Sequence, residues 1–163
     1  MTQLKAGMSA ASFTLRDTDG RQIGFDAAGP GRKLLVFYKV TCPTCQFGMP
    51  YFDRLFQAFS GSGVPVFAVV QDEVPDAQSF AQTYGVTIPQ LVDSEPYRVS
   101  NEYRIKSVPT FFIIGEDGAI EIASESFNKA DIERSAELLA ESTGVEVPQV
   151  FEDGESVPDF KPG

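Results

Sequence analysis

Two apolar runs dominate the hydrophobic pattern of the chain. Residues 33–39 and 64–70 are apolar at nearly all their interior positions, which is typical of strands buried on both faces of a sheet. Between them, residues 43–60 carry large apolar side chains at helical spacing: Met49, Phe52, Phe56 and Phe59. A strand, a helix and a second buried strand in this order predict a parallel βαβ unit.

Shorter elements precede and follow this unit. Residues 13–15 and 23–25 flank an Asp-Gly pair, as do residues 111–114 and 119–123, so both pairs of runs are predicted hairpins. The other predicted elements are a helix around 77–84, a strand at 88–92, a short helix at 96–103 and a last helix ending near 144. Because strands alternate with helices, we predict an α/β fold with helices on both faces of the sheet.

The C-terminal segment differs in composition from the rest of the chain. We expect one domain over residues 1–144, which is an ordinary domain size, and a tail over residues 145–163. The tail is rich in proline and acidic residues and carries two aromatic side chains, Phe151 and Phe160. It is either a disordered terminus or an extended arm whose aromatic side chains dock on the domain.

Composition and charge narrow the function classes. The formal net charge is −10, which argues against nucleic acid or an anionic membrane surface as a partner, because both require a basic patch. No stretch reaches the length of a transmembrane helix, and the N-terminus has no apolar signal region. We therefore expect a cytoplasmic protein, or a periplasmic or exported one if a leader has been removed.

Candidate chemistry is concentrated in one short motif. Cys42 and Cys45 are the only cysteines, the chain has no histidine, and the pair lies between the first buried strand and the helix that follows. A CxxC motif in this place indicates redox chemistry, because the free N–H groups and the dipole of a helix N-terminus stabilise a thiolate. Pro43 suits the first helical turn, where a missing N–H does no harm.

Two other interpretations of the cysteine pair are weaker. A structural disulfide across so short a ring would constrain little of the unfolded chain and would therefore stabilise little. A zinc site needs four nitrogen or sulfur ligands, and the chain offers two. We expect neither a metal nor another cofactor.

Four segments carry a family likeness: the predicted hairpin at 10–21, the motif from Cys42 to Cys45, Pro50 within the next helix, and Ser107-Val108-Pro109-Thr110 before an apolar strand. Together they resemble the thioredoxin-like redoxins, most closely the TlpA-like thiol–disulfide oxidoreductases and the related AhpC/TSA group. The likeness covers about residues 5–144, and residues 71–104 look like the insertion of redoxins. It implies a thioredoxin-like fold with a central mixed β-sheet flanked by helices, an N-terminal β-hairpin and a redoxin-type insertion.

The motif and the resemblance assign roles to four residues. Cys42, at the helix start, is expected to attack, and Cys45, one turn further in, to resolve the mixed disulfide. The resemblance implies that Pro109 is cis, packs near the disulfide and leaves the backbone of Val108 free to bind a substrate peptide. The alternative for Pro109 is an ordinary proline at the start of a strand.

Neighbours of the motif are expected to support it. Thr44 either donates a hydrogen bond near the Cys42 sulfur or faces water. Lys39 either stabilises the thiolate by its charge or extends its stem along the surface with its ammonium in water. Thr41 stands where the resembled family usually has tryptophan.

The sequence departs from the family at its buried acid. Plain thioredoxins have an aspartate at the position of Val36, and some TlpA-like proteins have a glutamate at the position of Gly48. The group that receives the Cys45 proton is therefore not evident.

We predict a monomeric thiol–disulfide oxidoreductase that reduces protein or small-molecule disulfides with electrons from an unidentified donor. One alternative is a thiol peroxidase, although Leu35 and Lys39 stand where peroxiredoxins carry a proline and a threonine. Another is a non-enzymatic redox-sensing or binding module that uses the acidic tail as its contact.

Overall fold

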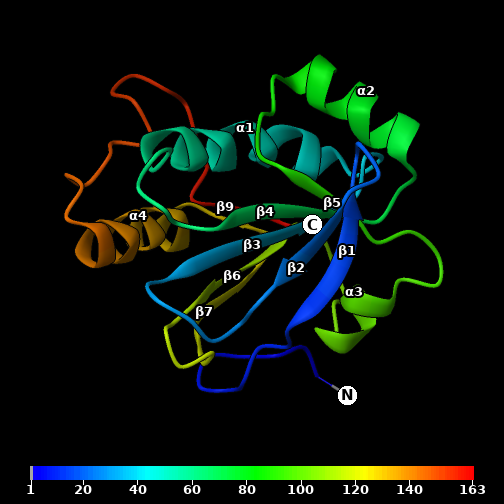
Figure 1. The fold of residues 1–163 in the computed structure, drawn as a ribbon. Coiled ribbons are helices and arrows are strands. Elements are labelled where there is room, and N and C mark those ends of the chain that lie inside the picture. The colour runs from blue at the N-terminus through cyan, green and yellow to red at the C-terminus, as the bar shows by residue number, and fades with distance from the viewer. Residues whose placement is uncertain (1) are drawn as a thin grey trace.

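The computed structural model describes residues 2–163, which form a mixed β-sheet with helices on both faces (Figure 1). The main sheet contains β1 (Phe13–Asp17), β2 (Gln22–Phe25), β3 (Lys33–Tyr38), β4 (Val66–Val70), β5 (Gln90–Val92), β6 (Thr110–Ile114) and β7 (Ile120–Glu125). The helices are α1 (Pro43–Ala58), α2 (Val74–Tyr84), α3 (Arg98–Glu102) and α4 (Lys129–Thr143). A second, two-stranded sheet pairs β8 (Phe127–Asn128) with β9 (Phe160–Lys161).

The order of strands in the main sheet is β2-β1-β5-β4-β3-β6-β7. Strands β3, β4 and β5 are parallel, while β6 runs antiparallel to β3, and β7 runs antiparallel to β6. The hairpin β1–β2 joins the other edge through an antiparallel pair with β5. The structure thus confirms the predicted mixed sheet with its βαβ unit and N-terminal hairpin.

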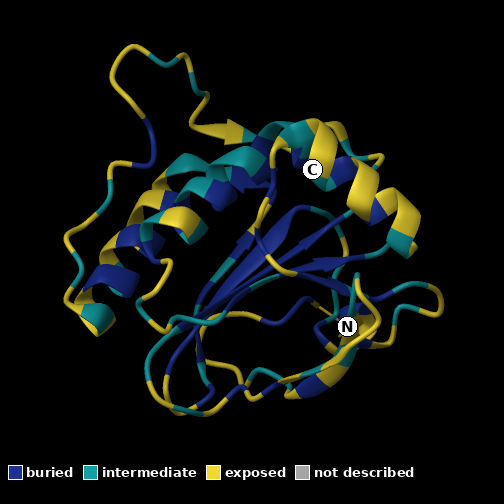
Figure 2. Ribbon diagram, turned by 45° about the horizontal axis from the view of Figure 1, so that its top comes forward, coloured by how far each residue is buried: buried dark blue, intermediate teal, exposed yellow. Residues whose placement is uncertain are grey.

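Strand β3 separates two hydrophobic layers because its side chains alternate between the faces of the sheet. Leu34, Val36 and Tyr38 pack with residues of α1, α2 and α4, whereas Leu35 and Phe37 pack with α3 and the N-terminal segment. All six residues of β3 are buried, and Figure 2 shows the buried strands between helices whose outer surfaces are exposed. This burial fixes the point where β3 ends and the loop to α1 begins.

The tail is a docked arm over part of its length. Phe151 is buried, with its ring centroid 5.1 Å from that of Tyr51 and 6.2 Å from that of Phe127. Phe160 is 55% exposed, so the expectation of docking is right for Phe151 and wrong for Phe160. The difference follows from β9, which holds Phe160 by backbone pairing and leaves its side chain in solvent. The strands β8 and β9 were not predicted.

Phe52 joins α1 to the sheet and allows a test of this packing. Its side chain is fully buried and meets the ring of Phe111 edge-on at 5.1 Å between centroids. We expect Phe52→Ala to lower the free energy of unfolding by about 3–5 kcal/mol, because it leaves a large cavity. Denaturant unfolding of the reduced protein measures the change. Phe160→Ala is the matched control and should cost less than about 0.5 kcal/mol, since its side chain is exposed; equal losses would contradict the packing described.

Candidate active site

The two cysteines lie at the junction between β3 and α1. Cys42 is the N-cap residue of α1, and its sulfur accepts a hydrogen bond from the Cys45 backbone N–H at 3.1 Å. Pro43 occupies the first turn of the helix, as the motif predicts. A sulfur that satisfies a free N–H of the first turn is also positioned where the helix dipole favours negative charge.

The two thiols differ in their surroundings. Cys42 is partly exposed, whereas Cys45 is fully buried, and neither forms a disulfide in this structure. Burial raises the pKa of the Cys45 thiol well above its usual range, and its hydrogen bond to the Cys42 side chain raises the pKa further. The proton is therefore held on Cys45, and the sulfur that a substrate can reach is that of Cys42.

The loop before β6 lies against the Cys42 sulfur. The Val108–Pro109 peptide bond is cis, and the Cys42 thiol donates a hydrogen bond to the Val108 carbonyl oxygen at 3.4 Å. The segment that the sequence places far from the motif is thus brought to it, as the resemblance implies. The motif and this loop face each other across the start of α1.

Thr44 is used in a way that the sequence did not predict. Its side chain is buried, and its hydroxyl donates to the Pro162 carbonyl oxygen rather than to the Cys42 sulfur or to water. Both alternatives weighed for Thr44 are therefore wrong, because the tail returns to the start of α1 and covers the hydroxyl.

Thr41 and Lys39 lie in the loop between β3 and α1. Thr41 is exposed and Lys39 is partly buried. The Lys39 backbone N–H hydrogen bonds to the Cys45 sulfur and partly offsets the rise in its pKa. Lys39 thus acts on the buried thiol through its backbone, and the two alternatives for its side chain stay predictions.

Asp72, which the sequence analysis does not single out, belongs to the site. Its carboxylate accepts a hydrogen bond from the Val40 N–H at 2.9 Å, and its negative charge adds to the rise in the pKa of Cys45. Tyr38 is affected in the same way: burial raises its pKa most, with a further contribution from Asp72. The available signal was topological, because the carboxyl ends of neighbouring parallel strands meet, and Asp72 follows β4 as the motif follows β3.

Aromatic packing accounts for the absence of the glutamate that some TlpA-like proteins have at position 48. A Cβ built on Gly48 would lie 3.2 Å from the Phe127 ring, which is tighter than ordinary packing, so a glutamate there would require Phe127 to move. Val36, at the position of the other family acid, is fully buried among apolar side chains. Neither position leaves room for a carboxylate without repacking.

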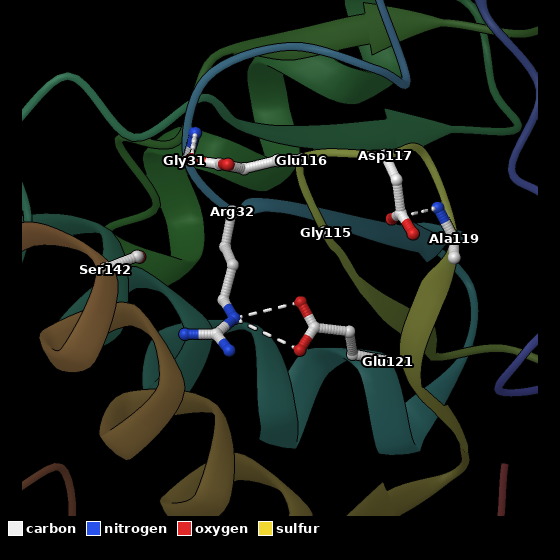
Figure 3. A pocket seen from close by; sticks show the side chains of 8 residues that line it. All are labelled: Gly31, Arg32, Gly115, Glu116, Asp117, Ala119, Glu121 and Ser142. Carbon is white, nitrogen blue, oxygen red and sulfur yellow. Dashed lines mark hydrogen bonds and ion pairs between the residues drawn. The ribbon is translucent and has the colours of Figure 1, made fainter.

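A large pocket lies away from this chemistry (Figure 3). Its volume is about 620 Å³, and it lies beside Arg32, which precedes β3, whereas the cysteines follow the other end of that strand. The Arg32 guanidinium already binds the Glu121 carboxylate at 2.9 Å and the Leu138 carbonyl oxygen at 2.8 Å. Through these contacts the charged Arg32 side chain connects the β6–β7 end of the fold to α4.

A family model described as the AhpC/TSA family matches residues 6–123. The chain belongs to this family. The thiol-disulfide oxidoreductase ResA of Geobacillus kaustophilus (strain HTA426) is 32% identical over 141 residues, which cover 85% of this chain and 80% of the relative. The predicted class of the protein, a thiol–disulfide oxidoreductase of the redoxin family, is thereby confirmed.

Solved structures confirm the thioredoxin-like fold. The thiol:disulfide interchange protein DsbE from Chlorobium tepidum superposes with a TM-score of 0.73 at 24% identity, covering 86% of this chain and 99% of that one. A protein disulfide isomerase from Bacteroides thetaiotaomicron gives a TM-score of 0.76 at 21% identity, covering 85% and 94%.

Two further observations concern the described part of the chain. None of the helices within residues 2–163 combines the length and the apolar character needed to span a bilayer. Over the same residues, no three histidine, cysteine, aspartate or glutamate side chains are grouped so that they could hold a metal ion.

Replacing Asp72 tests its influence on the buried thiol. We expect Asp72→Asn to lower the pKa of Cys45, because the substitution removes a negative charge that disfavours the thiolate and keeps an oxygen to accept the Val40 N–H. The measurement is an alkaline titration of thiolate absorbance in a Cys42→Ser background, where Cys45 is the only thiol.

Glu137→Gln, on the exposed side of α4, is the control because it removes the same charge far from the motif. An unchanged Cys45 titration in Asp72→Asn, or an equal shift in both variants, would show that the Asp72 charge does not act locally.

Proposed function

We propose that Cys42 and Cys45 are the redox couple of this oxidoreductase and that it reduces disulfides of proteins or small molecules. One observation carries the proposal: a partly exposed sulfur caps the start of α1 and accepts the Cys45 backbone N–H, while the Cys45 thiol lies buried one turn further in. This arrangement gives one nucleophile that a substrate can reach and one that acts only afterwards.

In the first step, the Cys42 thiolate attacks one sulfur of the substrate disulfide. The substrate S–S bond breaks as the new bond to Cys42 forms, and the leaving thiolate takes a proton from solvent. The N–H of Cys45 and the start of α1 hold the Cys42 sulfur and favour its negative charge. The product of this step is a mixed disulfide.

In the second step, Cys45 loses its proton and attacks the Cys42 sulfur. Two effects that raise the pKa of Cys45 depend on Cys42: the hydrogen bond between the two side chains and the Cys42 charge. Both end when Cys42 enters the mixed disulfide, so Cys45 becomes easier to ionise at the moment it is needed. Its attack releases the second substrate thiolate and leaves a Cys42–Cys45 disulfide.

The proposed partners follow from this two-electron cycle. The enzyme receives two electrons from a thiol donor and passes them to a disulfide-containing protein or small molecule, without a cofactor or metal. The net charge of −10 argues against nucleic acid and anionic membrane surfaces. We propose that it works as a monomer.

The peroxidase alternative gains no support from the site. Leu35 stands where peroxiredoxins have a proline, and its side chain packs on the side of the sheet opposite α1. The binding-module alternative rests on the tail, which contacts Thr44 of the motif.

Substituting each cysteine tests the order of attack. We expect Cys45→Ser to accumulate mixed disulfides through Cys42, because the resolving thiol is absent. Cys42→Ser should reduce disulfides no faster than the uncatalysed exchange, since Cys45 is buried and protonated. Mass spectrometry after acid quenching identifies the adducts. Adducts on Cys45 in the Cys42→Ser variant, with none in Cys45→Ser, would reverse the assignment.

The reduction potential tests the direction of electron flow and the compartment. The expected cytoplasmic location stays a prediction, with a periplasmic or exported location as its alternative. Equilibration in defined thiol buffers, followed by alkylation and mass analysis, should give about −270 mV for a reductase suited to the cytosol. A value above about −180 mV would instead indicate an oxidant or isomerase and would favour an exported location.

A further inference from the structure

The end of the tail contacts the candidate active site at several points. From the end of α4 the tail, orange to red in Figure 1, turns back along α1, and β9 pairs antiparallel with β8. The Lys129 N–H donates to the Asp159 carbonyl oxygen at 3.0 Å, which extends this pairing by one hydrogen bond. The Lys161 ammonium lies 5.4 Å from the centre of the Phe47 ring on α1.

One peptide group of the tail is held on both sides. The Thr44 hydroxyl donates to the Pro162 carbonyl oxygen, and the Gly163 N–H donates to the Ser126 hydroxyl oxygen at 3.0 Å. The Pro162 carbonyl and the Gly163 N–H belong to the same peptide bond, so the Thr44 and Ser126 hydroxyl groups bind both of its polar groups. Neither contact involves a side chain of the tail, so the pair recognises polypeptide backbone.

The protein positions both hydroxyl groups firmly. Thr44 is buried in the first turn of α1, two residues after Cys42. Ser126 is buried between β7 and β8 with φ of +69°, a conformation that is uncommon for residues other than glycine. Its backbone N–H donates to the Pro109 carbonyl oxygen at 2.8 Å, which ties Ser126 to the loop beside Cys42.

The bound peptide group lies next to the reactive sulfur. A Cβ built on Gly163 would overlap the Val108 carbonyl oxygen and lie 2.8 Å from the Val108 carbonyl carbon. The same carbonyl oxygen is 3.4 Å from the Cys42 sulfur. Gly163 therefore lies where the chain of a polypeptide substrate must pass to bring its disulfide to Cys42.

A second set of contacts holds the middle of the tail. The Arg54 guanidinium binds both oxygens of the Glu155 carboxylate, at 2.7 and 2.9 Å, and donates to the Val150 carbonyl oxygen at 2.8 Å. This bidentate ion pair keeps the tail close to α1, so residues 158–163 remain at a high local concentration beside the cysteines.

We propose that Thr44 and Ser126 form a binding site for extended polypeptide backbone beside Cys42, and that residues 158–163 occupy it until a polypeptide substrate displaces them. Strand addition at an exposed edge supplies such recognition through main-chain hydrogen bonds. A small disulfide needs no backbone site and reaches Cys42 past the docked tail. The inference rests on the proposed function, because it assigns the peptide site to the disulfide-reducing cysteines.

The experiment compares two disulfides that release the same coloured thiol. One is dithiobis(nitrobenzoate), and the other is a short uncharged peptide whose single cysteine carries thionitrobenzoate. The reduced full-length protein is mixed with each, and thiol release and formation of the Cys42–Cys45 disulfide are followed. Glu155→Lys places like charges at the Arg54 contact, and Gly163→Val adds a side chain where the backbone leaves no room.

Each variant has a matched control in the same tail. Glu146→Lys makes the same charge change at an exposed residue, and Ser156→Val adds similar bulk at another. If the tail is docked nine-tenths of the time, releasing it should raise the apparent affinity for the peptide about tenfold. We expect Glu155→Lys and Gly163→Val to react faster with the peptide by about this factor at low concentration. Both should react with dithiobis(nitrobenzoate) within about twofold of the wild-type rate, as should both controls with either substrate.

Three results would overturn the proposal. Peptide rates equal to wild type in both tail variants would show that the tail does not compete. Equal acceleration with both substrates would show a tail that shields Cys42 without occupying a peptide site. Failure of either disulfide to produce the Cys42–Cys45 disulfide would overturn the proposed function, and this inference with it.

A direct measurement distinguishes displacement from shielding. In the Cys45→Ser variant, a trapped peptide adduct on Cys42 should abolish hydrogen-exchange protection of the Gly163 amide, whose partner is Ser126. A trapped nitrobenzoate adduct should leave this protection in place. Protection that survives the peptide adduct would contradict displacement.

Discussion

The hydrogen bond from the Cys45 N–H to the Cys42 sulfur is the contact on which the proposed chemistry depends. A helix leaves its first N–H groups without partners, and here a sulfur takes the place that a hydroxyl or carboxylate usually has. The backbone of α1 thus both positions the Cys42 sulfur and favours negative charge on it. A chain without histidine can therefore still hold an attacking thiolate, because no charged side chain has to be brought to it.

That same turn separates the two thiols by burial. Three residues along the helix, Cys45 faces the apolar layer beneath α1, where burial keeps it protonated. Asp72 reinforces this state, since its negative charge opposes a second one nearby. In the proposed cycle, the neutral form of buried Cys45 therefore sets the order of the two attacks.

The sequence predicted the parts of the fold that rest on periodicity. The buried runs of β3 and β4 and the helical spacing in α1 are long enough to show their period, and the CxxC motif identified the cysteines. Strands of two residues, such as β8 and β9, have no period to detect. Asp72 could be found only from its place after β4, the parallel neighbour of β3. Ser126 could not be found because its role depends on which strands become neighbours, and the role of Thr44 could not because its partner is more than a hundred residues away.

Phe127 packs at position 48, where the family's glutamate is absent, and also contacts the tail. Its ring packs against Gly48, where some relatives have a glutamate, and it also packs against Phe151 of the tail. Its backbone, in β8, pairs with Lys161 in β9. A side chain at position 48 would require this ring to shift, and the tail contacts the same ring. One aromatic residue thus packs against the position of the family's glutamate and, through β8, supplies the edge that pairs with the tail.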